Sequence, residues 1–134
     1  MTDQIEAVWR HLPNAAVIDA VLADVNARPR AWDVAWDALW DEPWDLAVDI
    51  AWSVADAAER DAVRGAVRVA TQDVGMSATW DTAEGALVAL IAWPSSADML
   101  ALTPDALRTI IATCDGDVKH QAVLLLPAVI AQSA

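Results

Sequence analysis

Residues 31–49 read AWDVAWDALWDEPWDLAVD, so a Trp-Asp pair recurs every four residues and Asp49 continues the acidic series. A spacing of four places side chains on neighbouring turns of a helix, which makes one turn in about 3.6 residues. The segment is therefore predicted to be helical, with a row of indoles beside a row of carboxylates. Pro43 interrupts the series, because a proline inside a helix removes a hydrogen bond and clashes with the preceding turn. We expect a break near residues 41–42, with Asp41 capping the next helix.

The composition of the whole chain favours helices. Apolar residues make up 57% of the 134 residues, and only four Gly and six Pro are present. Alanine, the best helix former, is abundant, and no run alternates between apolar and polar residues as a strand would. We predict an all-α protein without a sheet, in which residues 1–134 form a single-domain helical bundle of about six or seven helices.

Prolines and glycines divide this predicted bundle. Helices are expected over residues 3–12, 14–26, 30–41, 42–72 (as one helix or two) and 78–93. Two further helices are expected, one before and one after Gly116. Pro29 is expected to separate two helices, and Gly75 to end the long segment. The stretch Pro94-Ser95-Ser96 is predicted to form a turn, and Pro127 to kink or divide the last helix.

Capping residues and helical patterns support these boundaries. Asn14, Thr103 and Asp117 are expected N-caps, and Pro104 follows Thr103 at the first helical position. Asp56 and Glu59 have the spacing of a capping box, which would start a helix at that point. Residues 86–92 are apolar on every face, so the helix over 78–93 is predicted to be the most buried.

The charge is strongly acidic, with 20 Asp and Glu against 8 Lys and Arg, for a net charge of -12. Such a protein should repel nucleic acid and anionic membranes, so we expect a basic protein partner. The apolar runs 86–93 and 122–131 are shorter than the ~20 residues that span a bilayer. Cys114 is the only cysteine and no signal peptide is apparent at the N-terminus, which together predict a cytoplasmic location.

The indole row has two interpretations. The chain holds eight Trp and no Phe or Tyr, so the indoles are its main large core fillers, and apolar rows on helices usually face the core. Alternatively, some of them form an exposed aromatic patch at an interface, where Trp is enriched. After Pro43 divides the series, Trp32, Trp36 and Trp40 remain as one row, and Trp44 and Trp52 belong to the following helix.

The acidic row also has two interpretations. Like charges spaced four apart cost about 0.2–0.5 kcal/mol per pair in an isolated helix. The row could be a solvated surface of its helix. A basic row, Arg60, Arg64 and Arg68, could then lie opposite the aspartates if the helices that carry the two rows pack antiparallel. Alternatively, it is a surface presented to a basic partner, and the candidate partner-binding residues are then Asp33, Asp37, Asp41, Asp45 and Asp49.

Catalytic and metal-binding patterns are weak. His11 and His120 are the only histidines, and the group formed by Cys114, Asp115, Asp117 and His120 matches no zinc spacing and no calcium loop. No serine lies in a nucleophile elbow, and no Gly-rich loop could hold phosphate. We therefore predict no catalytic, metal or cofactor site, and expect that the protein is not an enzyme.

Three segments carry a resemblance. The segment AWDVAWDALWD over residues 31–41, with the apolar runs ALIAW over 89–93 and AVLLL over 122–126, resembles small Ala/Trp/Asp-rich helical proteins of unknown function. Those proteins come from actinobacteria and actinobacteriophages. The resemblance implies provenance and brings no known chemistry, so no functional residue is carried over from it.

The leading functional hypothesis is a non-enzymatic acidic accessory protein, encoded by a phage or prophage, that binds a host or defence protein. One version is nucleic-acid mimicry. B-DNA carries a charge every ~1.7 Å, whereas an acidic row spaced four along a helix has one every ~6 Å, so mimicry would need acids from several helices. The alternatives are an immunity-type antidote to a basic toxin and a structural protein that forms homo-oligomers.

Overall fold

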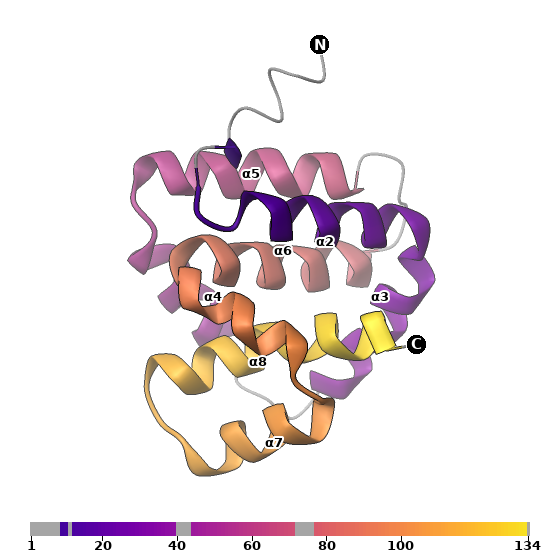
Figure 1. Ribbon diagram of the computed structural model, residues 1–134, viewed down its shortest axis with the longest axis vertical. Coiled ribbons are helices and arrows are strands. Elements are labelled where there is room, and N and C mark those ends of the chain that lie inside the picture. The colour runs from indigo at the N-terminus through magenta and orange to yellow at the C-terminus, as the bar shows by residue number, and fades with distance from the viewer. Residues whose placement is uncertain (1–8, 11, 40–43, 72–76, 134) are drawn as a thin grey trace.

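The computed structural model describes residues 9–10, 12–39, 44–71 and 77–133, and these residues are almost entirely helical (Figure 1). They form seven α-helices and two 3-10 helices: α2 (Ala15–Ala27), α3 (Pro29–Ala35), η1 (Trp36–Leu39), α4 (Trp44–Val54), α5 (Ala57–Thr71), α6 (Ser77–Ala92), η2 (Pro94–Ala101), α7 (Pro104–Thr113) and α8 (Asp117–Ser133). No strand occurs in these ranges. The predicted all-α class is confirmed, with slightly more helices than expected.

Helices α6 and α8 form the centre of the bundle. Helix α6 packs against α5, α3, α4 and α8, and α8 packs against α7, α4 and α3 as well, so both lie between other helices (Figure 1). Residues 86–92 of α6 are all buried, which confirms the prediction made from their apolar run. The α8 residues 121–129 are buried in the same way, because apolar side chains cover every face of this segment.

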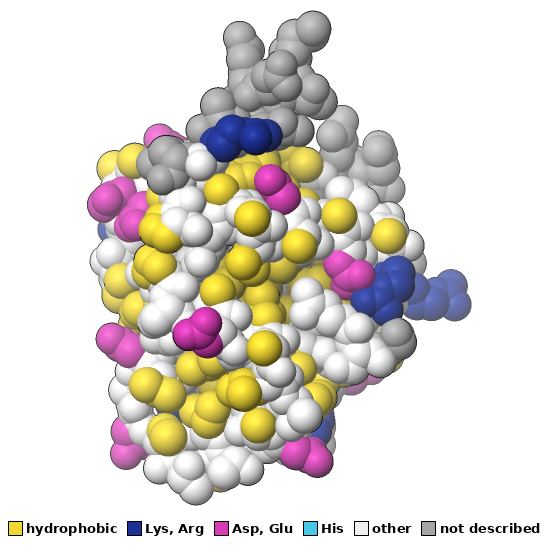
Figure 2. Space-filling model, in the orientation of Figure 1, with side chains coloured by type: hydrophobic (Ala, Val, Ile, Leu, Met, Phe, Trp, Pro, Cys, Tyr) yellow, Lys and Arg dark blue, Asp and Glu magenta, His cyan; other side chains and the backbone are white. Residues whose placement is uncertain are grey.

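The face drawn in Figure 2 is largely apolar. Hydrophobic side chains, many of them small, cover much of it, and acidic groups appear there singly. Apolar atoms contribute more than half of an ordinary protein surface, so this face alone does not mark a binding site.

Asn14 joins α2 to the end of α6. Its Nδ2 donates to the carbonyl oxygens of Leu90, at 2.8 Å, and Pro94, at 2.9 Å. In a regular helix the Leu90 carbonyl would accept from residue 94, but Pro94 has no N–H. Asn14 therefore supplies the missing donor inside the core. Asn14 occupies the N-cap position of α2 as predicted, but its side chain makes no capping hydrogen bond.

Pro29 separates α2 from α3, as predicted. Pro29 is the first residue of α3, where its missing N–H costs nothing, so the expected start at Arg30 lies one residue late. Pro94 likewise opens η2, which replaces the predicted turn. Pro127 lies inside a continuous α8, so of the two predicted outcomes the division of the helix does not occur. Burial on all sides of α8 holds the helix together there, because packing contributes most of a helix's stability.

The Trp-Asp segment is less regular than its sequence suggests. Helix α3 ends at Ala35 and tightens into η1 over Trp36–Leu39, so the predicted single α-helix does not continue to residue 41. Of the predicted indole row, Trp32 lies on α3 and Trp36 lies on η1, so the row does not lie on a single α-helix. Trp40, Asp41 and Pro43 lie outside the described residues, as does Gly75, so the expected break, cap and helix end at these residues are not described. Helix α4 begins at Trp44.

Residues 44–71 form two helices, which answers the question left open by the sequence. The predicted capping box separates them: the Asp56 amide donates to Glu59 Oε1 and the Glu59 amide donates to Asp56 Oδ1, both at 2.8 Å. Thr103 also caps α7 as predicted, accepting from the Ala106 amide at 3.1 Å. Gly116, with φ +74°, adopts the left-handed conformation that glycine permits between α7 and α8.

Most described indoles lie in the core. Trp9, Trp32, Trp44 and Trp93 are buried, Trp36 and Trp52 are half-buried, and Trp80 is 46% exposed. Trp32 Nε1 donates to Asp24 Oδ2 at 2.7 Å, which satisfies its polar atom. The core interpretation is therefore confirmed for Trp32 and Trp44, and the exposed indole lies outside the predicted row.

Candidate functional site

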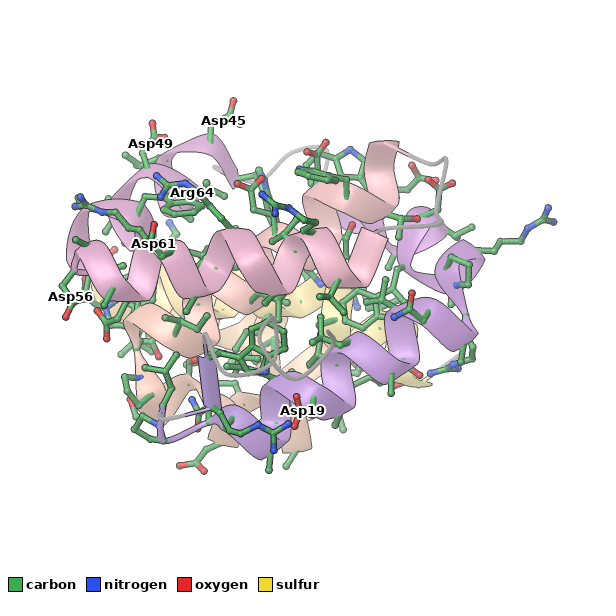
Figure 3. The ribbon with its side chains drawn as sticks, turned by 90° about the horizontal axis from the view of Figure 1, so that it is seen from above. Asp19, Asp45, Asp49, Asp56, Asp61 and Arg64 are labelled. Carbon is green, nitrogen blue, oxygen red and sulfur yellow. The ribbon has the colours of Figure 1, made fainter. Side chains whose placement is uncertain are left out.

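The structure separates the acidic residues proposed from the sequence. Asp33 is half-buried on α3, Asp37 is exposed on η1, and Asp41 lies outside the described residues. Asp45 and Asp49 are both exposed on α4, one turn apart, and they project together away from the body (Figure 3). Of the four candidate residues that the structure describes, Asp45 and Asp49 are therefore the two that share one regular helical face.

A carboxylate from another helix joins this pair. Burial raises the pKa of Asp81 on α6 above its ordinary value, and the negative charge of Asp45 raises it further. Within the described part of the chain, no ion pair offsets Asp45, Asp49 or Asp81. We name these three residues the acidic surface. Asp45 acts electrostatically on Asp81 and lies one turn from Asp49, so a positive charge placed near Asp45 would be stabilised by neighbouring carboxylates.

The expected lacing of this surface by arginines does not occur. Helices α4 and α5 both pack on α6, but they do not pack against each other along their lengths. Arg60 Nε donates to the Trp52 carbonyl at 2.9 Å, and Arg64 pairs with Asp61 of its own helix at 3.0 Å. The row Arg60, Arg64 and Arg68 therefore does not pair with the aspartates among the described residues, so the predicted arginine lacing is wrong. The other part of that interpretation, a solvated face, agrees with the exposure of Asp37, Asp45 and Asp49.

A cavity of about 250 Å³ opens where α4 and α5 both rest on α6. We call it the groove. Two buried valines of α5 form apolar lining, two indoles face it from α4 and α6, and three charged side chains complete it. The lining residues are Trp52, Val63, Arg64, Val67, Arg68, Trp80 and Glu84.

The three charged side chains of the groove differ in how many contacts they already make with other residues of the protein. The Arg64 guanidinium lies 5.6 Å from the centre of the Trp52 ring, in a cation–π position, while it pairs with Asp61. Burial raises the pKa of Glu84, a hydrogen bond from the Trp52 side chain opposes that rise, and the charge of Asp81 adds to it. Among the described residues, Arg68 makes no hydrogen bond and no ion pair.

Sequence reasoning missed the residues that α6 contributes. Trp80 and Asp81 form a further Trp-Asp pair outside residues 31–49, with Glu84 one turn later. That repetition was the available signal. What the sequence could not supply was the packing that brings α4 and α5 onto this part of α6.

The described residues hold no reactive constellation at this site. The groove lining contains no Ser, Cys or His, so its arrangement suits binding more than covalent chemistry. His120 has a buried Nδ1 without a hydrogen-bond partner, and Cys114 is half-buried. A search of the same described ranges finds no group of three or more His, Cys, Asp or Glu side chains placed to hold a metal ion.

No family model matches the chain, and no curated protein or solved structure is detectably similar to it. The functional argument therefore rests on the residues themselves. None of the described helices is both long and apolar enough to cross a membrane.

Proposed function

We propose that this protein is a non-enzymatic accessory protein that binds a basic protein through the acidic surface, Asp45, Asp49 and Asp81. The observation that carries the proposal is the exposed, unneutralised pair on α4 beside Asp81 of α6. The net charge of -12 supports it, since such a field speeds encounters with positively charged partners. A host protein, a defence protein and a basic toxin all belong to this partner class.

Nucleic-acid mimicry is a narrower version of this proposal. Asp45 and Asp49 alone are spaced too widely to imitate a phosphate backbone, in which charges follow every ~1.7 Å. Asp81 adds a carboxylate from a second helix, which is the kind of arrangement that mimicry requires. Competition by duplex DNA for the captured partner would separate mimicry from general charge attraction.

The test compares two variants with the same change of net charge. One carries Asp45→Asn, Asp49→Asn and Asp81→Asn. The control carries three substitutions at exposed acids of other elements, at Asp98, Asp115 and Asp117. Each protein is immobilised and exposed to cytoplasm of the native host, and mass spectrometry identifies the retained proteins.

We expect the wild type and the control to retain the same basic protein and the acidic-surface variant to lose it. Affinity should also fall as salt is added, because surface charges are screened. Equal loss from both variants would mean that only net charge matters, and equal retention by both would exclude this surface.

A further inference from the structure

We propose that the groove between α4, α5 and α6 binds a free aromatic amino acid in its zwitterionic form. Arg68 receives the ligand's carboxylate, Glu84 receives its ammonium group, and the ring rests against the indoles of Trp52 and Trp80. This inference concerns the groove and is independent of the acidic surface, whose three residues do not line it.

The size and lining of the groove point to a small ligand with a flat ring. Pockets for drug-sized ligands usually enclose ~300–1,000 Å³, and the groove, at about 250 Å³, is slightly smaller. Trp52 and Trp80 present indoles to it over apolar Val63 and Val67. Trp80 is 46% exposed although it is one of the largest apolar side chains. An aromatic ring bound in the groove would cover this indole and gain the energy of ring–ring contact.

The positions of Arg68 and Glu84 point to a ligand that carries both a negative and a positive charge. Helices α5 and α6 run antiparallel and pack together, so Arg68 and Trp80 lie near their connection, and Arg64 and Glu84 lie one turn further along (Figure 1). Arg64 already forms an ion pair with Asp61 (both labelled in Figure 3) and a cation–π contact with the Trp52 ring. Arg68 makes no hydrogen bond or ion pair among the described residues. Glu84 accepts from the Trp52 side chain, but a carboxylate has further lone pairs with which it can accept from a ligand. These two charged groups, one from α5 and one from α6, are therefore the ones that a ligand can engage.

The charge of the whole protein favours the same conclusion. With a net charge of -12, the chain repels anions in general, while a bare cation in the groove would meet Arg64 and Arg68. A zwitterion has no net charge and satisfies both Arg68 and Glu84. A partner's chain end does not fit this requirement, because a C-terminal residue lacks the free ammonium and an N-terminal residue lacks the free carboxylate.

The experiment uses the full chain and L-phenylalanine as the probe, with binding followed by calorimetry and by the indole N–H resonances of uniformly ¹⁵N-labelled protein. Three analogues each lack one feature: phenethylamine lacks the carboxylate, 3-phenylpropionate lacks the ammonium group, and alanine lacks the ring. We expect phenylalanine to shift the Trp52 and Trp80 resonances, and each analogue to bind about tenfold more weakly or worse. Phenethylamine and 3-phenylpropionate each lose a hydrogen bond to a charged group, and alanine loses the contact of its ring with the indoles.

Two variants assign the charges. Arg68→Gln should weaken phenylalanine about tenfold while leaving phenethylamine unchanged, and Glu84→Gln should weaken phenylalanine while leaving 3-phenylpropionate unchanged. Arg108→Gln on α7, outside the groove, is the matched control and should bind like the wild type. Circular dichroism of each variant confirms that it is folded.

Three outcomes would overturn the inference. One is the absence of any shift of Trp52 and Trp80 up to the solubility limit of phenylalanine. Another is phenethylamine or 3-phenylpropionate binding as tightly as phenylalanine, which would make the site one for cations or for anions. The third is equal weakening by Arg108→Gln, which would mean that the effect of charge is not local.

Discussion

The effect of Gly85→Ala on stability is predicted to depend on the side chain at position 44: alanine should destabilise the protein when Trp44 is present and stabilise it when a smaller residue replaces Trp44. An ideal Cβ built on Gly85 overlaps the six-membered ring of the Trp44 indole, so the α4 side chain packs directly on the α6 backbone. Trp44 is only 9% exposed, and its ring meets Trp36 edge-on with ring centres 5.0 Å apart. The indole is therefore confined between the Gly85 backbone and the Trp36 ring.

Two opposing effects decide the magnitude for Gly85→Ala. Alanine is favoured over glycine inside a helix by about 0.8–1.0 kcal/mol. Inserting a methyl group into a filled core costs about 1–3 kcal/mol, and an overlap with a confined ring belongs at the upper end. We expect Gly85→Ala to lower the free energy of unfolding by about 2 kcal/mol. In a Trp44→Leu background the obstruction is removed, so the same substitution should raise the free energy of unfolding by up to about 1 kcal/mol.

Urea unfolding followed by far-ultraviolet circular dichroism would measure all four proteins of this double-mutant cycle. Trp44→Leu itself should cost less than the ~3–5 kcal/mol of a Trp→Ala change, which leaves a folded background if the total stability lies within the usual ~5–15 kcal/mol. The reasoning would be refuted if Gly85→Ala stabilised the wild type, or if its effect had the same sign and size in both backgrounds.

Three further predictions concern single side chains. Asp56→Ala should lower the free energy of unfolding by about 1 kcal/mol, because it removes half of the capping box with Glu59; an unchanged urea midpoint would contradict this. Trp32→Phe should lower it by about 2–3 kcal/mol, since Asp24 loses a buried donor and the core loses volume; a loss below 1 kcal/mol, about half the smallest change expected, would count against it. The raised pKa of Glu84 means that the folded protein holds this proton more tightly than the unfolded chain does. The stabilisation from this group is thus present below pH 4.5 and is lost as the pH rises through the folded pKa. The free energy of unfolding of Glu84→Gln should therefore rise relative to that of the wild type across this pH window, as measured by urea unfolding at several pH values. A difference between the two proteins that stays constant at every pH would contradict the prediction.

Local chemistry in the sequence was sufficient for several elements of this protein. The Asp56–Glu59 capping box and the Thr103 cap each act within three residues of their own helix, so their hydrogen bonds follow from local spacing. The burial of residues 86–92 follows from the absence of any polar face. The sequence by itself therefore determined the all-α class and the burial of residues 86–92.

Contacts between distant residues were decided only by the tertiary structure. The role of Asn14 depends on the Leu90 carbonyl, which lacks its usual donor because residue 94 is proline, and no local pattern connects these positions. Likewise, Trp52 and Trp80 meet in one groove only because α4 and α5 both pack on α6 without packing on each other. The Trp-Asp series predicted helices and core indoles, but its aspartates became a surface only where packing placed Asp81 beside Asp45. Periodicity specifies the face of one helix, whereas a site made of several helices depends on how their side chains fit together.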